Sequence, residues 1–151
     1  MHGHGIIHRD IACRNLLLDE HLNVAVADFG YARKREKNDG DQTQTREGPV
    51  RWEAPETLWH RTYSESSDAF MFGVCLWEMI SGCLPWPDSN MVQVCQSVLQ
   101  GQRLKVPLNC AGALGALIFK CWAHDAKQRP SLKQASRPQA VNPLNNPLSN
   151  L

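Results

Sequence analysis

The fold of this chain is decided by two stretches, His8-Arg9-Asp10-Ile11-Ala12-Cys13-Arg14-Asn15 and Asp28-Phe29-Gly30. The first brings a carboxylate, a guanidinium and an amide within six residues, and the second places another carboxylate before a glycine, 18 residues after Asp10. Carboxylate and amide oxygens are the ligands that hard divalent cations prefer. Arg14 is a fixed positive charge close enough in sequence to reach the same site. The two stretches therefore predict one site that combines cation ligands with a positive charge.

Both stretches resemble motifs of the protein kinase catalytic domain, of the tyrosine-kinase or tyrosine-kinase-like type. The first matches the catalytic loop, the second matches the metal-binding triplet, and Ala54-Pro55-Glu56 matches the end of the activation segment. The resemblance extends to Pro130. It implies a kinase-like C-terminal lobe, an α+β fold that is mainly α-helical and has a small β-hairpin near the catalytic loop.

The pattern of apolar and turn residues predicts local structure independently. Two apolar runs, residues 15–18 and 24–27, are separated by five turn-forming residues and predict a β-hairpin. Residues 31–48 carry many charges and almost nothing apolar to anchor them, so we expect a long mobile loop there.

Helix-like periodicity dominates the rest of the chain. It covers residues 66–80, 90–99 and 111–122, with prolines between them, and a short helix is expected to run to Ser136. Beyond that point, proline and asparagine leave little to pack. We expect a lobe over residues 1–136 and a disordered tail over residues 137–151.

Composition limits the function classes. The chain has 151 residues, 42% of them hydrophobic, and a formal net charge of +1. A field this weak cannot gather polyanions, which argues against a nucleic-acid partner. The longest apolar stretch, residues 70–80, is interrupted by Glu78 and is too short to span a bilayer, and no signal peptide precedes it. We therefore expect no membrane segment and a cytoplasmic location, either of this chain or as the cytoplasmic part of a longer protein.

The cysteines and the first histidines give no metal signal. Six cysteines without a C-x-x-C pair argue against a zinc ribbon or a redox dithiol and favour free thiols. His2 and His4 have no third ligand nearby in sequence and are expected to form a solvated turn.

The resemblance assigns catalytic roles within the first stretch. Asp10 would be the base that orients the substrate hydroxyl and accepts its proton. Arg14 would supply a positive charge near the transferring phosphate, and Asn15 would complete the catalytic set. A protein is the implied substrate.

The resemblance also implies ATP and Mg²⁺ as cofactors. Asn15 and Asp28 would hold the metal. Leu17 and Ala27 would face the adenine.

Other positions resemble structural elements of the family. His8 would pack beneath Phe29 rather than act as an acid or base. Glu56 and Arg129 would form a buried ion pair that ties the activation segment to the end of the helical lobe. Asp68 would open the central helix and hold the backbone of the catalytic loop.

The predicted loop offers acceptors for regulatory phosphorylation. Thr43 and Thr45 are better placed than Tyr31, and a phosphate on either could pair with Arg9 and Arg33 to order the segment. Each threonine could equally be an ordinary polar loop residue.

The sequence lacks several parts of a complete kinase. It has no G-x-G-x-x-G loop, and the lysine and glutamate of the nucleotide-binding lobe have no counterpart. We expect the amino-terminal lobe to be absent from this fragment and to be its missing partner. The isolated chain is then expected to be inactive.

Three functions are compatible with the sequence. Ala12 and Arg14 in the loop, with Pro49 and Trp52 near the activation-segment end, favour a tyrosine-directed phosphotransferase. The absence of tyrosine between Ala32 and Trp52 leaves a serine/threonine or dual-specificity enzyme open. A non-catalytic, pseudokinase-like interaction module is the third possibility.

Overall fold

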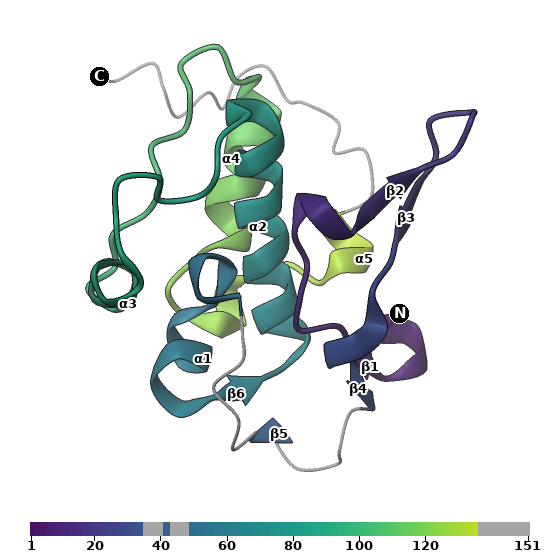
Figure 1. The fold of residues 1–151 in the computed structure, drawn as a ribbon, viewed down its shortest axis with the longest axis horizontal. Coiled ribbons are helices and arrows are strands. Elements are labelled where there is room, and N and C mark those ends of the chain that lie inside the picture. The colour runs from purple at the N-terminus through teal and green to yellow at the C-terminus, as the bar shows by residue number, and fades with distance from the viewer. Residues whose placement is uncertain (35–40, 43–48, 136–151) are drawn as a thin grey trace.

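A computed structural model describes residues 1–34, 41–42 and 49–135 (Figure 1). Within these residues, helices make up most of the body: α1 (Pro55–His60), α2 (Glu65–Ser81), α3 (Met91–Leu99), α4 (Gly112–Cys121) and α5 (Leu132–Ala135). Short antiparallel pairs join β1 (Ile6–Ile7) to β4 (Arg33–Lys34), β2 (Leu16–Leu18) to β3 (Val24–Val26), and β5 (Asp41–Gln42) to β6 (Thr62–Tyr63). The mainly helical fold with a small hairpin, expected from the sequence, is confirmed.

The hairpin forms where the apolar runs predict it. Leu16 pairs with Val26 and Leu18 with Val24. In the turn, the Asp19 carboxylate accepts hydrogen bonds from the backbone N–H groups of His21 (2.9 Å) and Asn23 (2.8 Å). An aspartate that satisfies turn amides in this way fixes the turn, and the turn fixes the strand register.

Helix α2 is the central element of the fold. It starts with a capping box, in which the Ser64 hydroxyl accepts from the Ser67 N–H at 3.2 Å and the Ser67 hydroxyl accepts from the Ser64 N–H at 2.8 Å. It ends at Gly82, whose φ of 64° is left-handed and suits glycine. No helix among the described residues is both long enough and apolar enough to cross a membrane.

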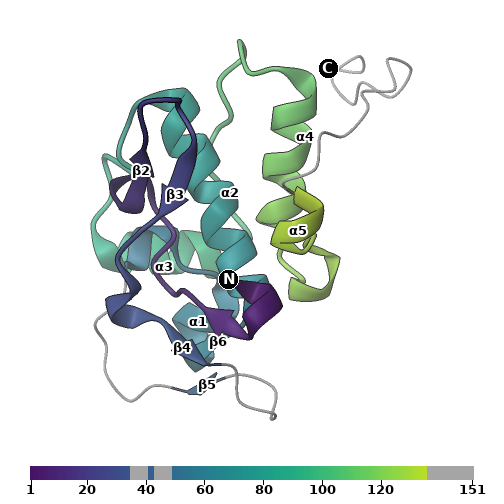
Figure 2. The ribbon, with the colours of Figure 1, turned by 90° about the vertical axis from the view of Figure 1, so that its right-hand side faces the viewer.

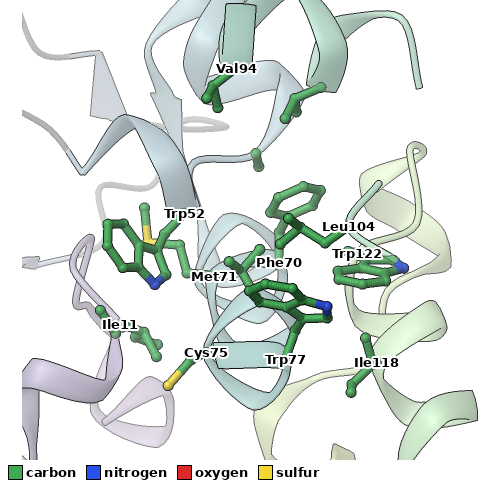
Figure 3. Packing of buried hydrophobic residues seen from close by; sticks show 14 of the residues in the cluster. Ile11, Trp52, Phe70, Met71, Cys75, Trp77, Val94, Leu104, Ile118 and Trp122 are labelled. Carbon is green, nitrogen blue, oxygen red and sulfur yellow. The ribbon is translucent and has the colours of Figure 1, made fainter. Parts of the chain in front are cut away.

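The core surrounds α2 on several sides. Figure 3 shows Trp52 on one side of the helix, and Trp122 with Ile118 on the other. From α2 itself, Phe70 and Met71 are buried among them. Burying each large side chain contributes about 1.5–3 kcal/mol, so these contacts hold α2 in place. Figure 2 shows the result: α2 lies between the β2–β3 hairpin and α4.

The expectation of a long loop over residues 31–48 is wrong in two places, because residues 33–34 and 41–42 form strands. Arg33 and Lys34 pair with Ile7 and Ile6, and strand β5 pairs with β6. Strands of two residues are held by main-chain hydrogen bonds. They are too short to show the alternation of apolar side chains by which a strand is predicted from sequence. Residues 35–40 and 43–48, with Thr43 and Thr45, and the predicted tail lie outside the described residues.

Candidate active site

Three polar side chains meet at Asp10, in the segment between β1 and the short helical turn Cys13–Asn15. Asp10 is buried. Arg14 donates to one oxygen of its carboxylate, and the Asn15 amide nitrogen donates to the other at 2.8 Å. The same Asn15 nitrogen also donates to the Asp10 carbonyl at 2.8 Å. The three predicted catalytic residues therefore form one hydrogen-bonded group.

The backbone before Asp10 is held from the first turn of α2. The fully buried Asp68 carboxylate accepts from the N–H of His8 at 2.8 Å and from the N–H of Arg9 at 2.9 Å. Arg9 has a φ of 69°, a conformation that non-glycine residues rarely adopt. Two hydrogen bonds to a buried carboxylate offset the cost of this strain.

His2 is part of this support, and its expected role as a solvated turn residue is wrong. Its Nε2 lies 2.8 Å from Asp68 Oδ2, and its side chain is mostly buried. The partner lies 66 residues away, so the sequence around His2 carries no signal of this contact.

The second predicted stretch lies directly beside the first. The Ala27 N–H donates to the Asn15 carbonyl at 2.8 Å, at the end of the hairpin. Asp28 adopts a φ of 60°, is exposed, and accepts from the Gly30 N–H at 3.1 Å. The hairpin therefore brings the backbone just before Asp28 next to Asn15.

His8 lies under Phe29, as the resemblance implies. The two rings meet edge to face with centroids 4.9 Å apart, and His8 is fully buried. The His8 ring nitrogen Nε2 lies 3.1 Å from the Ala27 carbonyl oxygen. Both His8 contacts join the first stretch to the second. Of the two residues expected to face adenine, Ala27 is half-buried and Leu17 is exposed.

Trp52, which the sequence analysis used only as a sign of tyrosine specificity, orients Arg14 with the help of Glu78. The Arg14 guanidinium lies 4.7 Å from the centre of the Trp52 ring. Trp52 in turn donates from Nε1 to Glu78 Oε2 on α2 at 3.0 Å. Stacking on an aromatic face orients a guanidinium while leaving its charge intact.

Glu53 adds a second buried carboxylate close to Asp10. The Tyr63 hydroxyl donates to Glu53 Oε1 at 3.0 Å. Burial raises the pKa of Glu53 above its usual value, the Tyr63 hydrogen bond opposes that rise, and the negative charge of Asp10 adds to it. The sequence analysis did not identify Glu53, because its hydrogen-bond partner Tyr63 lies 10 residues further along the chain.

Glu56 and Arg129 form a two-pronged ion pair. The distances are 2.6 Å from Nη1 to Oε1 and 2.9 Å from Nη2 to Oε2. Arg129 also donates to the carbonyls of Ala123 (2.8 Å) and Ser66 (2.9 Å). The pair links α1 to the segment before α5.

The two arginines expected to receive a regulatory phosphate occupy different surroundings. Arg9 is buried, with its guanidinium 4.8 Å from the centre of the Tyr63 ring. Arg33 is exposed and donates to the Ala32 carbonyl at 2.8 Å.

Comparison with known proteins agrees with this geometry. A family model described as protein tyrosine and serine/threonine kinase matches residues 1–138. Ephrin type-A receptor 1 of Mus musculus is 39% identical over 134 residues, covering 87% of this chain and 14% of the receptor. Ephrin type-A receptor 8 of Homo sapiens is 42% identical over 134 residues (86% of this chain, 13% of the receptor). Serine/threonine-protein kinase STY46 of Arabidopsis thaliana is 38% identical over 135 residues (89% of this chain, 23% of the kinase). The chain thus spans less than a quarter of the length of each of these relatives.

Proposed function

This chain belongs to the protein tyrosine and serine/threonine kinase family, and from that premise we propose that residues 1–136 are the C-terminal lobe of an ATP-dependent protein phosphotransferase directed at tyrosine. The observation that carries the proposal is the Asp10 carboxylate, held on both oxygens by Arg14 and Asn15. We place its activity in the cytoplasm, in this chain or in the cytoplasmic part of a longer protein.

Asp10 serves as the base in this proposal. Hydrogen bonds from Arg14 and Asn15 hold both oxygens of the carboxylate and fix its orientation. A fixed, ionised carboxylate can orient an acceptor hydroxyl and take its proton as the phosphoryl group moves. Arg14 keeps a positive charge beside the same oxygens.

Asn15 and Asp28 provide a ligand set that suits Mg²⁺. The amide nitrogen of Asn15 is committed to Asp10, which leaves its amide oxygen as the atom that can bind a cation. One Asp28 oxygen accepts from Gly30, and the exposed carboxylate presents the other. Magnesium bound there would neutralise charge on the phosphate oxygens of ATP. Leu17 and Ala27, on and after the hairpin, are proposed to contact the adenine.

The choice of tyrosine rests on the surroundings of Arg14. Serine/threonine kinases usually carry a lysine two residues after the base, where this chain has Ala12. Here the cation comes from Arg14, stacked on Trp52, which leaves room for a longer phenolic acceptor. Pro49, next to this tryptophan's helical turn, can support an aromatic ring.

A serine/threonine or dual-specificity enzyme is the second candidate, and the similarity to STY46 favours it. A non-catalytic interaction module is the third. The presence of Asp10, Asn15 and Asp28 weighs against that module, because a non-catalytic protein does not need the base and the metal ligands.

The test is a chimaera that joins the amino-terminal lobe of a protein kinase to residue 1, assayed on a mixed peptide library with magnesium and ATP. We expect mainly phosphotyrosine, a loss of kcat of about 100-fold or more in Asp10→Asn, and unchanged kcat in the surface variant Lys120→Ala. The 151-residue chain alone should show no turnover, because it contains no glycine-rich loop to position the phosphates.

Each other outcome decides between the alternatives. Dominant phosphoserine or phosphothreonine rejects tyrosine and supports the second candidate. A folded chimaera that binds nucleotide yet phosphorylates nothing supports the interaction module. Equal rates for Asp10→Asn and the unsubstituted chimaera would remove Asp10 from the chemistry.

A further inference from the structure

We propose that Cys13, Cys75 and Glu78 form a binding site for a thiophilic divalent cation of the zinc class. One potential ligand atom from each residue lies within 4.8 Å of the other two. Cys13 belongs to the turn that follows Asp10, while Cys75 and Glu78 lie on α2. A cation there would join the catalytic segment to the central helix.

The separation of the two sulfurs fits this occupant. The Sγ atoms of Cys13 and Cys75 are 3.6 Å apart. Two thiolates bound at about 2.3 Å to one tetrahedral zinc lie about 3.8 Å apart. The sulfurs therefore need almost no movement to share a cation.

The third ligand is already oriented by neighbours. Glu78 Oε2 accepts from the Cys13 N–H and from Trp52 Nε1, each at 3.0 Å. Such outer hydrogen bonds commonly hold metal-binding carboxylates in position. The three protein ligands leave a fourth position for water, the arrangement of an open zinc site.

Charge and access also suit a cation. Two thiolates and a carboxylate would carry three negative charges, which a divalent cation would offset. Cys75 is buried, whereas Cys13 and Glu78 are only partly so, which gives a path from solvent.

A disulfide is the competing use of the same pair. Oxidation would join only the two sulfurs, whereas a cation would also use the Glu78 carboxylate that lies beside them. The state of the two thiols in purified protein therefore distinguishes the two uses.

Cobalt(II) is the probe, titrated into the metal-free 151-residue chain in the presence of a phosphine reductant. We expect one equivalent to produce visible bands of tetrahedral cobalt and a thiolate-to-cobalt charge-transfer band, and zinc to displace it. Cys13→Ala and Cys13→Ser should abolish the charge-transfer intensity of this site. Glu78→Gln, which can still accept from Trp52, should weaken binding about tenfold or more.

The exposed cysteine provides the matched control. Cys83→Ala removes an exposed thiol that is not part of the cluster and should keep both the spectrum and a rise in melting temperature with saturating zinc. The Cys13 variants should lose that rise. Lack of a charge-transfer band in the unsubstituted chain, an unchanged band in folded Cys13→Ser, or a Cys13–Cys75 disulfide in freshly purified protein would each overturn the proposal.

Discussion

Arg129 shows how much a single side chain can hold in this fold. Its side chain is fully buried, pairs with Glu56 through two hydrogen bonds, and lies 5.0 Å from the centre of the Phe70 ring. Glu56 is half-buried, with 22% of its side chain exposed, so removing Arg129 leaves the Glu56 charge only partly solvated and without its partner. Loss of one partner is therefore expected to destabilise the fold by more than the intact pair stabilises it.

Arg129→Ala is expected to lower the free energy of unfolding by about 3–5 kcal/mol. The loss includes the hydrogen bonds to backbone carbonyls as well as the ion pair. Arg129→Lys should also destabilise the fold, because an ammonium cannot reproduce the two-pronged geometry. Urea denaturation measures both, with exposed Lys120→Ala as control. Equal midpoints for Arg129→Ala and Lys120→Ala would reject a structural role for the pair.

Glu53 makes the stability of the fold depend on pH. It is 6% exposed, and burial raises the pKa of its carboxyl above the usual value. The folded chain therefore binds this proton more tightly than the unfolded chain does. Ionised Glu53 costs stability above its folded pKa, and the cost fades as pH falls.

Glu53→Gln should accordingly raise the free energy of unfolding at neutral pH. Glutamine still accepts the Tyr63 hydrogen bond but carries no charge to bury. The gain should shrink as the pH is lowered, because the native carboxyl takes up its proton at a pH above the usual pKa of glutamate. Urea denaturation at a series of pH values is the measurement. Exposed Glu20→Gln should show no such trend, and a gain independent of pH would contradict the mechanism.

At the level of elements, local patterns predicted what local forces determine. The hairpin follows from apolar runs around a turn with Asp19, and α2 follows from periodicity and the Ser64 cap. The motif residues Asp10 and Asn15 are five apart, so their contact is also a local event.

Contacts between distant residues explain what the sequence could not predict. His2 reaches Asp68 across 66 positions, and Cys13 meets Cys75 across 62. All six cysteines are free thiols, as the sequence predicts, but their spacing gave no sign that the Cys13 turn and α2 bring Cys13, Cys75 and Glu78 together. These long-range contacts depend on tertiary packing, which the periodicity of a sequence does not predict.

The contact between α2 and α4 has a steric requirement at Gly73. A Cβ added there would lie 2.7 Å from the Cys121 Cβ and 3.3 Å from the Trp122 nitrogen. Gly73→Ala gains helix propensity of about 1 kcal/mol but forces the helices apart, at an overpacking cost of about 1–3 kcal/mol. We expect a net loss of stability.

Gly115→Ala on α4 is the matched control. Its added Cβ would meet Cys110 Sγ at an ordinary 3.8 Å, so only the helix propensity changes. We expect a slightly higher melting temperature for Gly115→Ala and a lower one for Gly73→Ala. The same sign of change in both variants would show that close packing does not determine the response at Gly73.

On the scale of the whole molecule, the β2–β3 hairpin stands out because several of its large apolar side chains are exposed. The β2–β3 hairpin and the turn after it expose Leu17 (57%), Leu18 (64%), Val24 (60%) and Phe29 (52%). Large exposed apolar side chains favour interaction with a partner or aggregation. We therefore expect the 151-residue chain to self-associate through the hairpin.

Replacing one cross-strand pair tests that expectation. Leu18 and Val24 are register partners, so Leu18→Glu with Val24→Lys puts opposite charges across the hairpin and removes two exposed apolar side chains. The double variant should sediment as a monomer at concentrations where the unsubstituted chain assembles, with a melting temperature nearly unchanged because neither side chain is in the core. Val92→Lys removes an equally exposed apolar residue (65%) on α3 and should leave the association intact. A monomeric unsubstituted chain, or equal relief by Val92→Lys, would mean that the hairpin is not the surface through which this molecule makes contacts.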